Sequence, residues 1–218
     1  MTNNIGTNPN LTIHQANDYH GLPLLDGHAP YIREYLDGIH RTIFSALSEY
    51  PRTFAARVDL HLPEFAFPID SAVISRFTAS FNSQIRADQT RKSKRNKRTH
   101  PCRVRYVWVK EKGTAIQSHY HLLLLFNHDC YHCLGDFGAG EGNLAAKVKR
   151  AWARAIGYDV IDIGGLVHFP KNGSYRVITN APSYSHDLQQ LFKRVSYFAK
   201  VRTKCSGDRT RSFGCSRN

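Results

Sequence analysis

Three stretches of the chain show the alternation or dense apolar character of strands. Residues 54–62 place apolar side chains between polar ones with a period of two. Residues 103–111 are rich in valine and aromatic side chains, and residues 118–126 end in four leucines and a phenylalanine. Successive side chains of a strand point to opposite faces. Each stretch therefore predicts a strand, and the last two are expected to form a hairpin around Gly113.

Four other stretches show helical periodicity, with apolar side chains recurring every three or four residues. They are residues 30–50, 70–85, 144–156 and 185–204. Asp70 is the expected N-cap of the second helix, and Gly157 is the expected end of the third. Short strands are predicted at 160–163, 166–169 and 175–178, with a hairpin turn at 171–173.

The net charge of the chain indicates the kind of partner that it binds. The 218 residues contain 30 Lys and Arg against 17 Asp and Glu, a formal net charge of +13. Such an excess favours a polyanion, most simply nucleic acid, over an anionic membrane surface. The sequence has no apolar run of membrane length, and its start is polar. Together with an odd number of cysteines, five, this predicts a cytoplasmic protein.

The predicted hairpin carries the best candidate chemistry. His119 and His121 stand two residues apart on one strand, so their imidazoles share a face. If residues 112–118 form the hairpin loop, Glu111 lies opposite His119. Two imidazoles and a carboxylate with open positions suit Mg²⁺ or Mn²⁺ bound to a phosphate substrate. Asp59 and His61, on the polar face of the first strand, are the alternative third ligands.

Two further metal or nucleotide motifs are weaker. Cys130 and Cys133 with His128 and His132 resemble a zinc site, but no second pair follows at finger-like spacing. The glycine-rich segment 135–143 lacks the Gly-Lys-Ser/Thr ending of a P-loop. No nucleoside triphosphate site is therefore predicted, and any helicase must come from elsewhere.

A dense basic run follows the second predicted helix. Six of its eight residues are charged, namely Arg91, Lys92, Lys94, Arg95, Lys97 and Arg98. A block of like charges is commonly a solvated, disordered loop when free. In a protein this basic, it is more simply interpreted as a grip on phosphates.

The last predicted helix combines a tyrosine with lysines. Lys193, Tyr197, Lys200 and Lys204 fall at offsets −4, 0, +3 and +7, which places them on one side of a helix. That face is a reasonable place for a phosphodiester. The alternative is a surface tyrosine covering lysine stems.

Three motifs, and their order along the chain, resemble those of the HUH endonucleases that start rolling-circle replication. They are Arg57–Leu62 as a first strand, His119-Tyr120-His121, and Tyr197-Phe198-Ala199-Lys200. Within that superfamily, residues 50–217 most resemble the inovirus-type gene-two replication proteins, the YagK/YfjJ C-terminal-domain group. Many phage initiators carry two tyrosines in the last motif. Here Tyr184 is expected to lie outside the helix, so the resemblance implies single-tyrosine chemistry at Tyr197.

The resemblance implies an α+β fold, a central, mostly antiparallel sheet with flanking helices. Residues 1–50 would be an N-terminal extension with a packing helix, 51–204 the endonuclease domain and 205–218 a tail. The implied activity is metal-dependent nicking and rejoining of single-stranded DNA at a replication origin. Tyr197 would form a 5′-phosphotyrosine, assisted by Lys200 and by Mg²⁺ or Mn²⁺ on His119, His121 and Glu111.

The implied setting is the cytoplasm of a bacterial host cell, with host helicase and polymerase as partners and no membrane. Lys193, Lys204 and the basic run would hold DNA. A single-tyrosine relaxase or transposase would use the same chemistry. A non-catalytic nucleic-acid-binding regulator would use the charge without the tyrosine.

Overall fold

The computed structural model of the chain describes residues 4–5, 8–63, 72–95, 99–111, 118–138, 140–202 and 211–217. Its main sheet is antiparallel and has six strands, in the order β10-β6-β8-β7-β11 with β9 also paired to β6. These strands are β6 (Arg52–His61), β7 (Arg105–Glu111), β8 (His119–Asn127), β9 (Val167–His168), β10 (Ser174–Ile178) and β11 (Phe213–Cys215). The α+β prediction, with a central antiparallel sheet and flanking helices, is confirmed.

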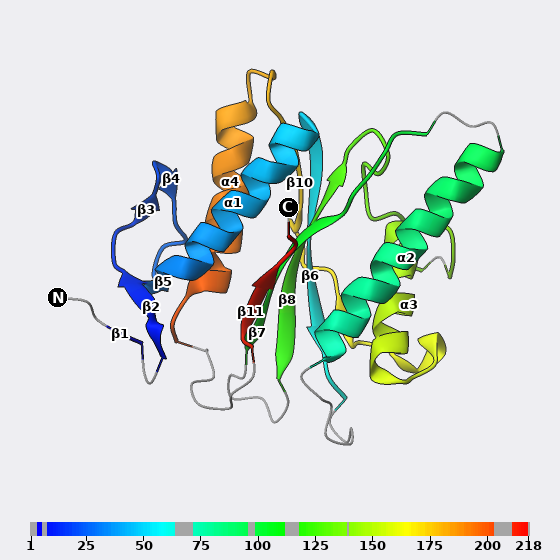
Figure 1. Ribbon diagram of the computed structural model, residues 1–218, viewed down its shortest axis with the longest axis horizontal. Helices are drawn as coiled ribbons and strands as arrows, with labels where there is room; N and C mark the ends of the chain where they lie inside the picture. Colours follow the sequence, from blue (N-terminus) through cyan, green and yellow to red (C-terminus); the bar gives the residue numbers. More distant parts are fainter. Residues whose placement is uncertain are drawn as a thin grey trace.

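Four helices cover the sheet, two on each face (Figure 1). They are α1 (Arg33–Glu49), α2 (Val73–Lys94), α3 (Leu144–Ile156) and α4 (Tyr184–Ser196). α1 and α4 bury the face that contains Ala55, Val107 and Leu123. α2 and α3 bury the face that contains Val58 and Leu122. The sheet is thus the middle of three layers, and both of its faces are core.

Small strands precede α1 along the chain. They are β1 (Asn4–Ile5), β2 (Asn8–His14), β3 (Asp18–Tyr19), β4 (Leu22–Pro23) and β5 (Tyr31–Ile32). Tyr31 and Ile32 are each 1% exposed and belong to the same core as α1 and α4. This N-terminal segment is therefore packed on the main sheet, while the expected domain boundary at residue 50 stays a prediction.

The predicted helix at 144–156 is confirmed at both ends. Asn143 accepts a hydrogen bond from the Ala146 amide through its side-chain oxygen at 2.8 Å, which caps the first turn. Gly157 ends the helix with φ = 77°, a left-handed conformation that glycine adopts without strain. Trp152 is fully buried, and its indole Nε1 donates to the His61 carbonyl at 2.9 Å. α3 therefore holds the end of β6 in place.

Several local predictions were wrong. Residues 160–162 form a 3₁₀ turn instead of a strand. Residues 171–173 do turn, but β9 and β10 on either side pair with β6 and not with each other, so no hairpin forms. The polar face of β6 is not solvated, because α4 and the segment after it cover it, and Arg57 and Asp59 are each 8% exposed. The expected N-cap Asp70 lies outside the described residues.

No helix in the described ranges combines the length and the apolar character that crossing a bilayer requires.

Candidate metal centre

Three neighbouring strands bring polar side chains together at one end of the sheet. β7 and β8 pair so that Glu111 lies opposite His119, and β6 pairs with β8 so that His61 lies opposite His119 and Asp59 opposite His121. Opposed residues of antiparallel strands share a face. The register predicted for Glu111 and His119 is therefore confirmed.

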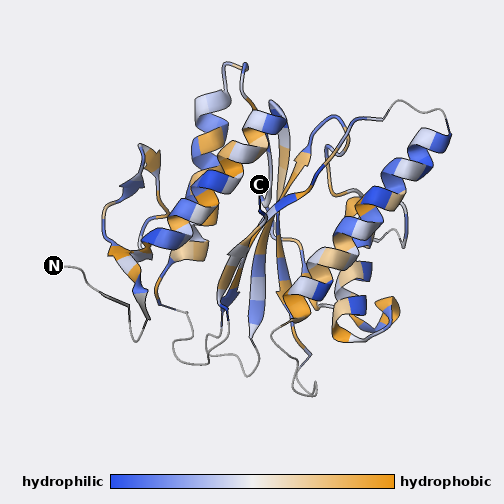
Figure 2. Cartoon of the chain, in the orientation of Figure 1, coloured by the Kyte–Doolittle hydropathy of each residue, from blue (hydrophilic) through white to orange (hydrophobic). Residues whose placement is uncertain are grey.

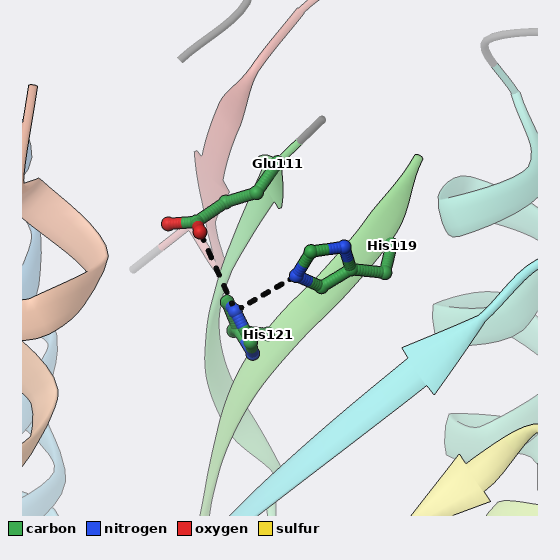
Figure 3. Close-up of side chains that lie close together, drawn as sticks. All are labelled: Glu111, His119 and His121. Atoms are coloured by element: carbon green, nitrogen blue, oxygen red, sulfur yellow. Dashed lines mark hydrogen bonds and ion pairs between the residues drawn. The ribbon is translucent and has the colours of Figure 1, made fainter. Parts of the chain in front are cut away.

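Glu111, His119 and His121 point toward one another from two adjacent strands (Figure 3). Nε2 of His119 is 3.1 Å from Nε2 of His121, and Nε2 of His121 is 3.6 Å from Oε2 of Glu111. One ligand atom from each of the three residues lies within 4.8 Å of the others. This cluster could hold a metal ion.

The Glu111 carboxylate is 1% exposed, so it needs a buried partner for its charge. Lys200 supplies one. Its Nζ lies 3.1 Å from Oε2 of Glu111, and the lysine is itself 5% exposed. The cluster therefore contains a cation from the chain beside its only carboxylate.

Asp59 holds His121 from the side opposite Glu111. Nδ1 of His121 lies 2.6 Å from Oδ1 of Asp59, and a carboxylate can only accept, so Nδ1 carries a hydrogen and Nε2 faces His119 and Glu111. Burial would raise the pKa of Asp59, but the hydrogen bond and charge of His121, together with Arg57, lower it to about 2. Nε of Arg57 also donates to Asp59, at 3.2 Å. Asp59 thus fixes the tautomer that a metal ligand needs.

His119 is prepared as a ligand in a different way. Burial and the neighbouring His121 lower its pKa to about 4, so its imidazole is neutral near pH 7. His61 stacks on it with ring centroids 5.4 Å apart, and burial also lowers the pKa of His61. His61 is therefore a packing neighbour of the cluster, and it stands outside the three-ligand set.

Tyr197 lies against this cluster. Its ring centroid is 5.5 Å from that of His121 and 3.3 Å from Nζ of Lys200. Cζ of Arg57 lies 5.1 Å from the same centroid, and the His28 ring lies 5.2 Å away edge-on. Lys200 thus contacts the Tyr197 ring and the Glu111 carboxylate at once.

The segment before α1 fixes the position of Tyr197. The Leu25 amide donates to Oγ of Ser196 at 3.0 Å, and the Val201 amide donates to the Pro30 carbonyl at 3.1 Å. Tyr31 forms a β-bridge with Lys200. The residues on both sides of Tyr197 are therefore tied to a part of the chain far away in sequence.

The predicted lysine face of the last helix is wrong. α4 ends at Ser196, and Tyr197–Ala199 form a 3₁₀ turn, so helical offsets do not apply beyond that point. Lys193 donates to Asp26 at 2.7 Å instead of facing the cluster. Tyr184, expected to precede the helix, is its first residue, at the end of α4 opposite Tyr197. Lys204 lies outside the described residues.

The predicted DNA-binding run is partly helical. Arg91, Lys92 and Lys94 occupy the last turn of α2, where Figure 2 shows hydrophilic residues gathered, and Arg95 follows as the C-cap. Lys92 is engaged, since its Nζ lies 3.1 Å from Asp88 and over the Tyr131 ring. Arg91, Lys94 and Arg95 are exposed. Lys97 and Arg98 lie outside the described residues.

The zinc hypothesis finds no support in the structure. Within the described ranges, the Glu111 cluster is the one grouping of three or more metal-ligating side chains. The Cys102 thiol donates a hydrogen bond to Cys130, which lowers the pKa of Cys130. All four described cysteines are free.

Sequence reasoning missed two site residues, His28 and Arg57. His28 follows a glycine in an irregular segment, which carries no periodic signal. Arg57 appeared only as a polar residue of its strand. The alternation of β6 with Asp59 and His61 was the available signal for Arg57, because all three share the face that α4 covers.

One known protein family matches nearly the whole length of the chain. The model of the YagK/YfjJ C-terminal domain matches residues 14–216, nearly the whole chain. The chain belongs to the YagK/YfjJ C-terminal domain family. Two similar proteins, both from Escherichia coli K12, cover most of the chain. The chain is 37% identical to "Uncharacterized protein YagK" over 198 residues, covering 87% of this chain and 95% of the relative. It is 35% identical to "Uncharacterized protein YfjJ" over 198 residues, covering 86% and 95%. No solved structure matches the chain.

Proposed function

We propose that this protein nicks and rejoins single-stranded DNA through a covalent bond to Tyr197, as a rolling-circle replication initiator of the HUH endonuclease superfamily. One observation carries the proposal. Tyr197 and the cluster of Glu111, His119 and His121 come from distant parts of the chain, yet Lys200 contacts both the tyrosine ring and the carboxylate. A nucleophile beside a cation site is the arrangement that phosphodiester transfer requires.

The cluster suits Mg²⁺ or Mn²⁺. Neighbouring ligands of an octahedral ion with bonds of about 2.1 Å lie about 3.0 Å apart. The Nε2 atoms of His119 and His121 are separated by 3.1 Å, which matches this spacing. When bound, the ion would neutralise and orient the scissile phosphate.

The chemical step conserves the number of phosphate ester bonds. Oη of Tyr197 attacks the phosphorus and loses its proton to solvent, while the bond from phosphorus to the 3′ oxygen breaks. The 3′ oxygen takes a proton from water, leaving a free 3′-OH and a 5′-phosphotyrosine. Because the ester energy is kept, a 3′-OH can reverse the step and rejoin strands without ATP.

The residues around Tyr197 orient it and stabilise negative charge. Cζ of Arg57 and Nζ of Lys200 lie 5.1 Å and 3.3 Å from the ring centroid, so two cations flank the tyrosine ring and could offset charge that develops at the phosphate. Asp59 keeps His121 oriented. The exposed arginines and lysine at the end of α2 would hold flanking DNA.

The order of the motifs supports the biological setting. The first strand, His119-Tyr120-His121 and Tyr197-Phe198-Ala199-Lys200 follow one another as in HUH initiators of the inovirus gene-two type. The chain would then act in the cytoplasm of a bacterial host at a replication origin. Host helicase and polymerase would extend the free 3′-OH.

The test is a covalent adduct. Labelled single strands that tile both strands of the DNA around the protein's own gene are incubated with it and Mn²⁺ or Mg²⁺, then resolved under denaturing conditions. We expect an adduct on one strand, absent with EDTA. Tyr197→Phe should abolish the adduct, because it removes the attacking oxygen and little else.

Tyr184→Phe is the matched control, since Tyr184 stands at the other end of α4, and it should keep the adduct. Mapping of the adduct to another tyrosine would reject Tyr197 as the nucleophile. If the wild type forms no adduct on any tiled strand but retains DNA in a salt-sensitive way, the protein is a non-catalytic nucleic-acid-binding regulator.

A further inference from the structure

A groove of about 860 Å³ lies on the sheet face opposite the metal centre. Its lining comes mainly from α2, the strand β7 and the segment that contains β11. Side chains of β7 alternate, so Tyr106 and Trp108 line this groove while Val107, Val109 and Glu111 face the other way. The groove and the metal centre are therefore separated by the sheet itself.

The groove carries an excess of positive charge. Its arginines Arg86, Arg103, Arg211 and Arg217 are all exposed. Glu49 is its one acidic residue among those described, and Arg105 neutralises it through hydrogen bonds of 3.0 Å and 2.7 Å. Guanidinium groups bind phosphate oxygens through paired hydrogen bonds. The lining thus matches a phosphate-rich ligand.

Aromatic side chains accompany the arginines. Tyr50 and Tyr106 are partly exposed in the groove, and Trp108 forms its floor beneath Arg211, whose Cζ lies 5.9 Å from the indole centroid. A basic groove with aromatic surfaces is the general design of sites that bind single-stranded nucleic acid, where bases stack on the rings.

The groove wall is built by specific contacts. The Arg103 amide donates to the Tyr50 hydroxyl at 2.9 Å, and the Arg103 guanidinium donates to the Arg217 carbonyl at 2.7 Å. A Cβ at Gly214 would lie 2.6 Å from the Trp108 ring, so only glycine lets β11 lie this close to the indole. Arg211 and Arg217 on either side of β11 are thereby held at the groove.

We propose that this groove binds a segment of single-stranded nucleic acid, with the arginines on its phosphates and Tyr50 and Tyr106 against its bases. This site needs neither the metal cluster nor Tyr197, so it goes beyond the proposed strand transfer. Its volume is that of a small-molecule cleft and holds a few nucleotides. A DNA duplex is much wider, since its major groove alone is about 12 Å across. It would therefore touch only the rim of the protein groove.

Two exposed alanines of α2 offer a matched test. Ala79 lines the groove, whereas Ala87 lies on the same helix outside it. Binding of a labelled, mixed-sequence single strand is measured by fluorescence anisotropy in EDTA, so no strand is cut. Ala79→Glu should weaken binding by about tenfold or more, because the new carboxylate repels phosphates and competes with them for the arginines of the groove. Ala87→Glu adds the same net charge and should have a much smaller effect.

Arg86→Gln provides a second measurement. It should lower the slope of log affinity against log salt by about 0.7, the value for one neutralised phosphate. Arg154→Gln, at an exposed position on α3, should leave the slope unchanged. Equal effects of Ala79→Glu and Ala87→Glu, or an unaltered slope in Arg86→Gln, would overturn the groove assignment. Duplex DNA that binds as tightly as the single strand would overturn the preference for single strands.

The outcome is independent of the proposed chemistry. Tyr197→Phe should bind the single strand like the wild type under these conditions. If the protein forms no covalent adduct but shows the groove effects, the groove proposal stands and the strand-transfer proposal fails. If it forms the adduct without the groove effects, the strand-transfer proposal stands and the groove proposal fails.

Discussion

The Asp59 carboxylate and the His121 imidazole share a hydrogen bond of 2.6 Å between Oδ1 and Nδ1. The bond determines which nitrogen of His121 can reach a metal ion, because Nδ1 holds a hydrogen toward Asp59 while Nε2 faces His119 and Glu111. A residue of β6 outside the cluster therefore orients a candidate metal ligand on β8, as outer partners of ligating histidines commonly do.

Replacing Asp59 tests this role. Asp59→Ala removes the acceptor and should weaken Mn²⁺ binding by about 10–100-fold. Asp59→Asn keeps an oxygen that can accept the same hydrogen bond and should weaken it less. Both are measured by calorimetric titration of Mn²⁺, with circular dichroism to verify folding. Equal losses in the two variants would show that the charge of Asp59, and not its hydrogen bond, matters.

Replacing Glu111 and replacing Lys200 should change the affinity for Mn²⁺ in opposite directions. Glu111→Ala removes a ligand and should shift the Mn²⁺ titration about 10–100-fold to higher concentration. Lys200→Met removes a cation 3.1 Å from the carboxylate and should tighten Mn²⁺ binding by about tenfold or more, since nearby like charges repel strongly in a buried site. Adduct formation should slow in both variants. Weaker Mn²⁺ binding by Lys200→Met would mean that Lys200 positions Glu111 instead of competing for it.

His119 should make stability depend on pH. Its pKa is about 4 in the folded protein, against about 6.5 in an unfolded chain. As the pH falls from about 6.5 toward 4, the unfolded chain takes up a proton at this residue and the folded protein does not, so the free energy of unfolding decreases. His119→Gln lacks this group and should lose less stability over the same range. Urea denaturation in EDTA measures both, and parallel pH profiles would contradict the assignment.

The basic end of α2 should contribute to DNA affinity without sequence preference. Neutralising Arg91, Lys94 and Arg95 with glutamine should lower the salt slope by about 0.7 for each phosphate that these side chains neutralise. Lys92→Gln is the internal control, because Lys92 is held by Asp88, and it should change the slope little. Anisotropy titrations on several unrelated single strands measure this. A weakening confined to one sequence would point to base recognition.

The local elements around the metal centre could be predicted from sequence because their signals are local. Period-two alternation placed β6, and the hairpin length fixed Glu111 opposite His119, since strand pairing across a short loop leaves few registers. Gly157 marked the end of α3, because this kind of cap depends on a single residue and its immediate backbone. The chemistry of His119 and His121 was visible for the same reason, as neighbours on one strand share a face.

The surroundings of Tyr197 were decided only by the tertiary structure. A helical wheel placed Lys193 with Tyr197, but α4 ends at Ser196, where hydrogen bonds to the segment at 25–31 replace helical ones. Whether Arg57 is solvated or buried depends on what α4 covers, and no periodicity encodes that. Contacts between residues distant in sequence depend on how the layers pack. The alternation of β6 therefore determined which side chains share a face, and packing determined that this face became the wall of a site.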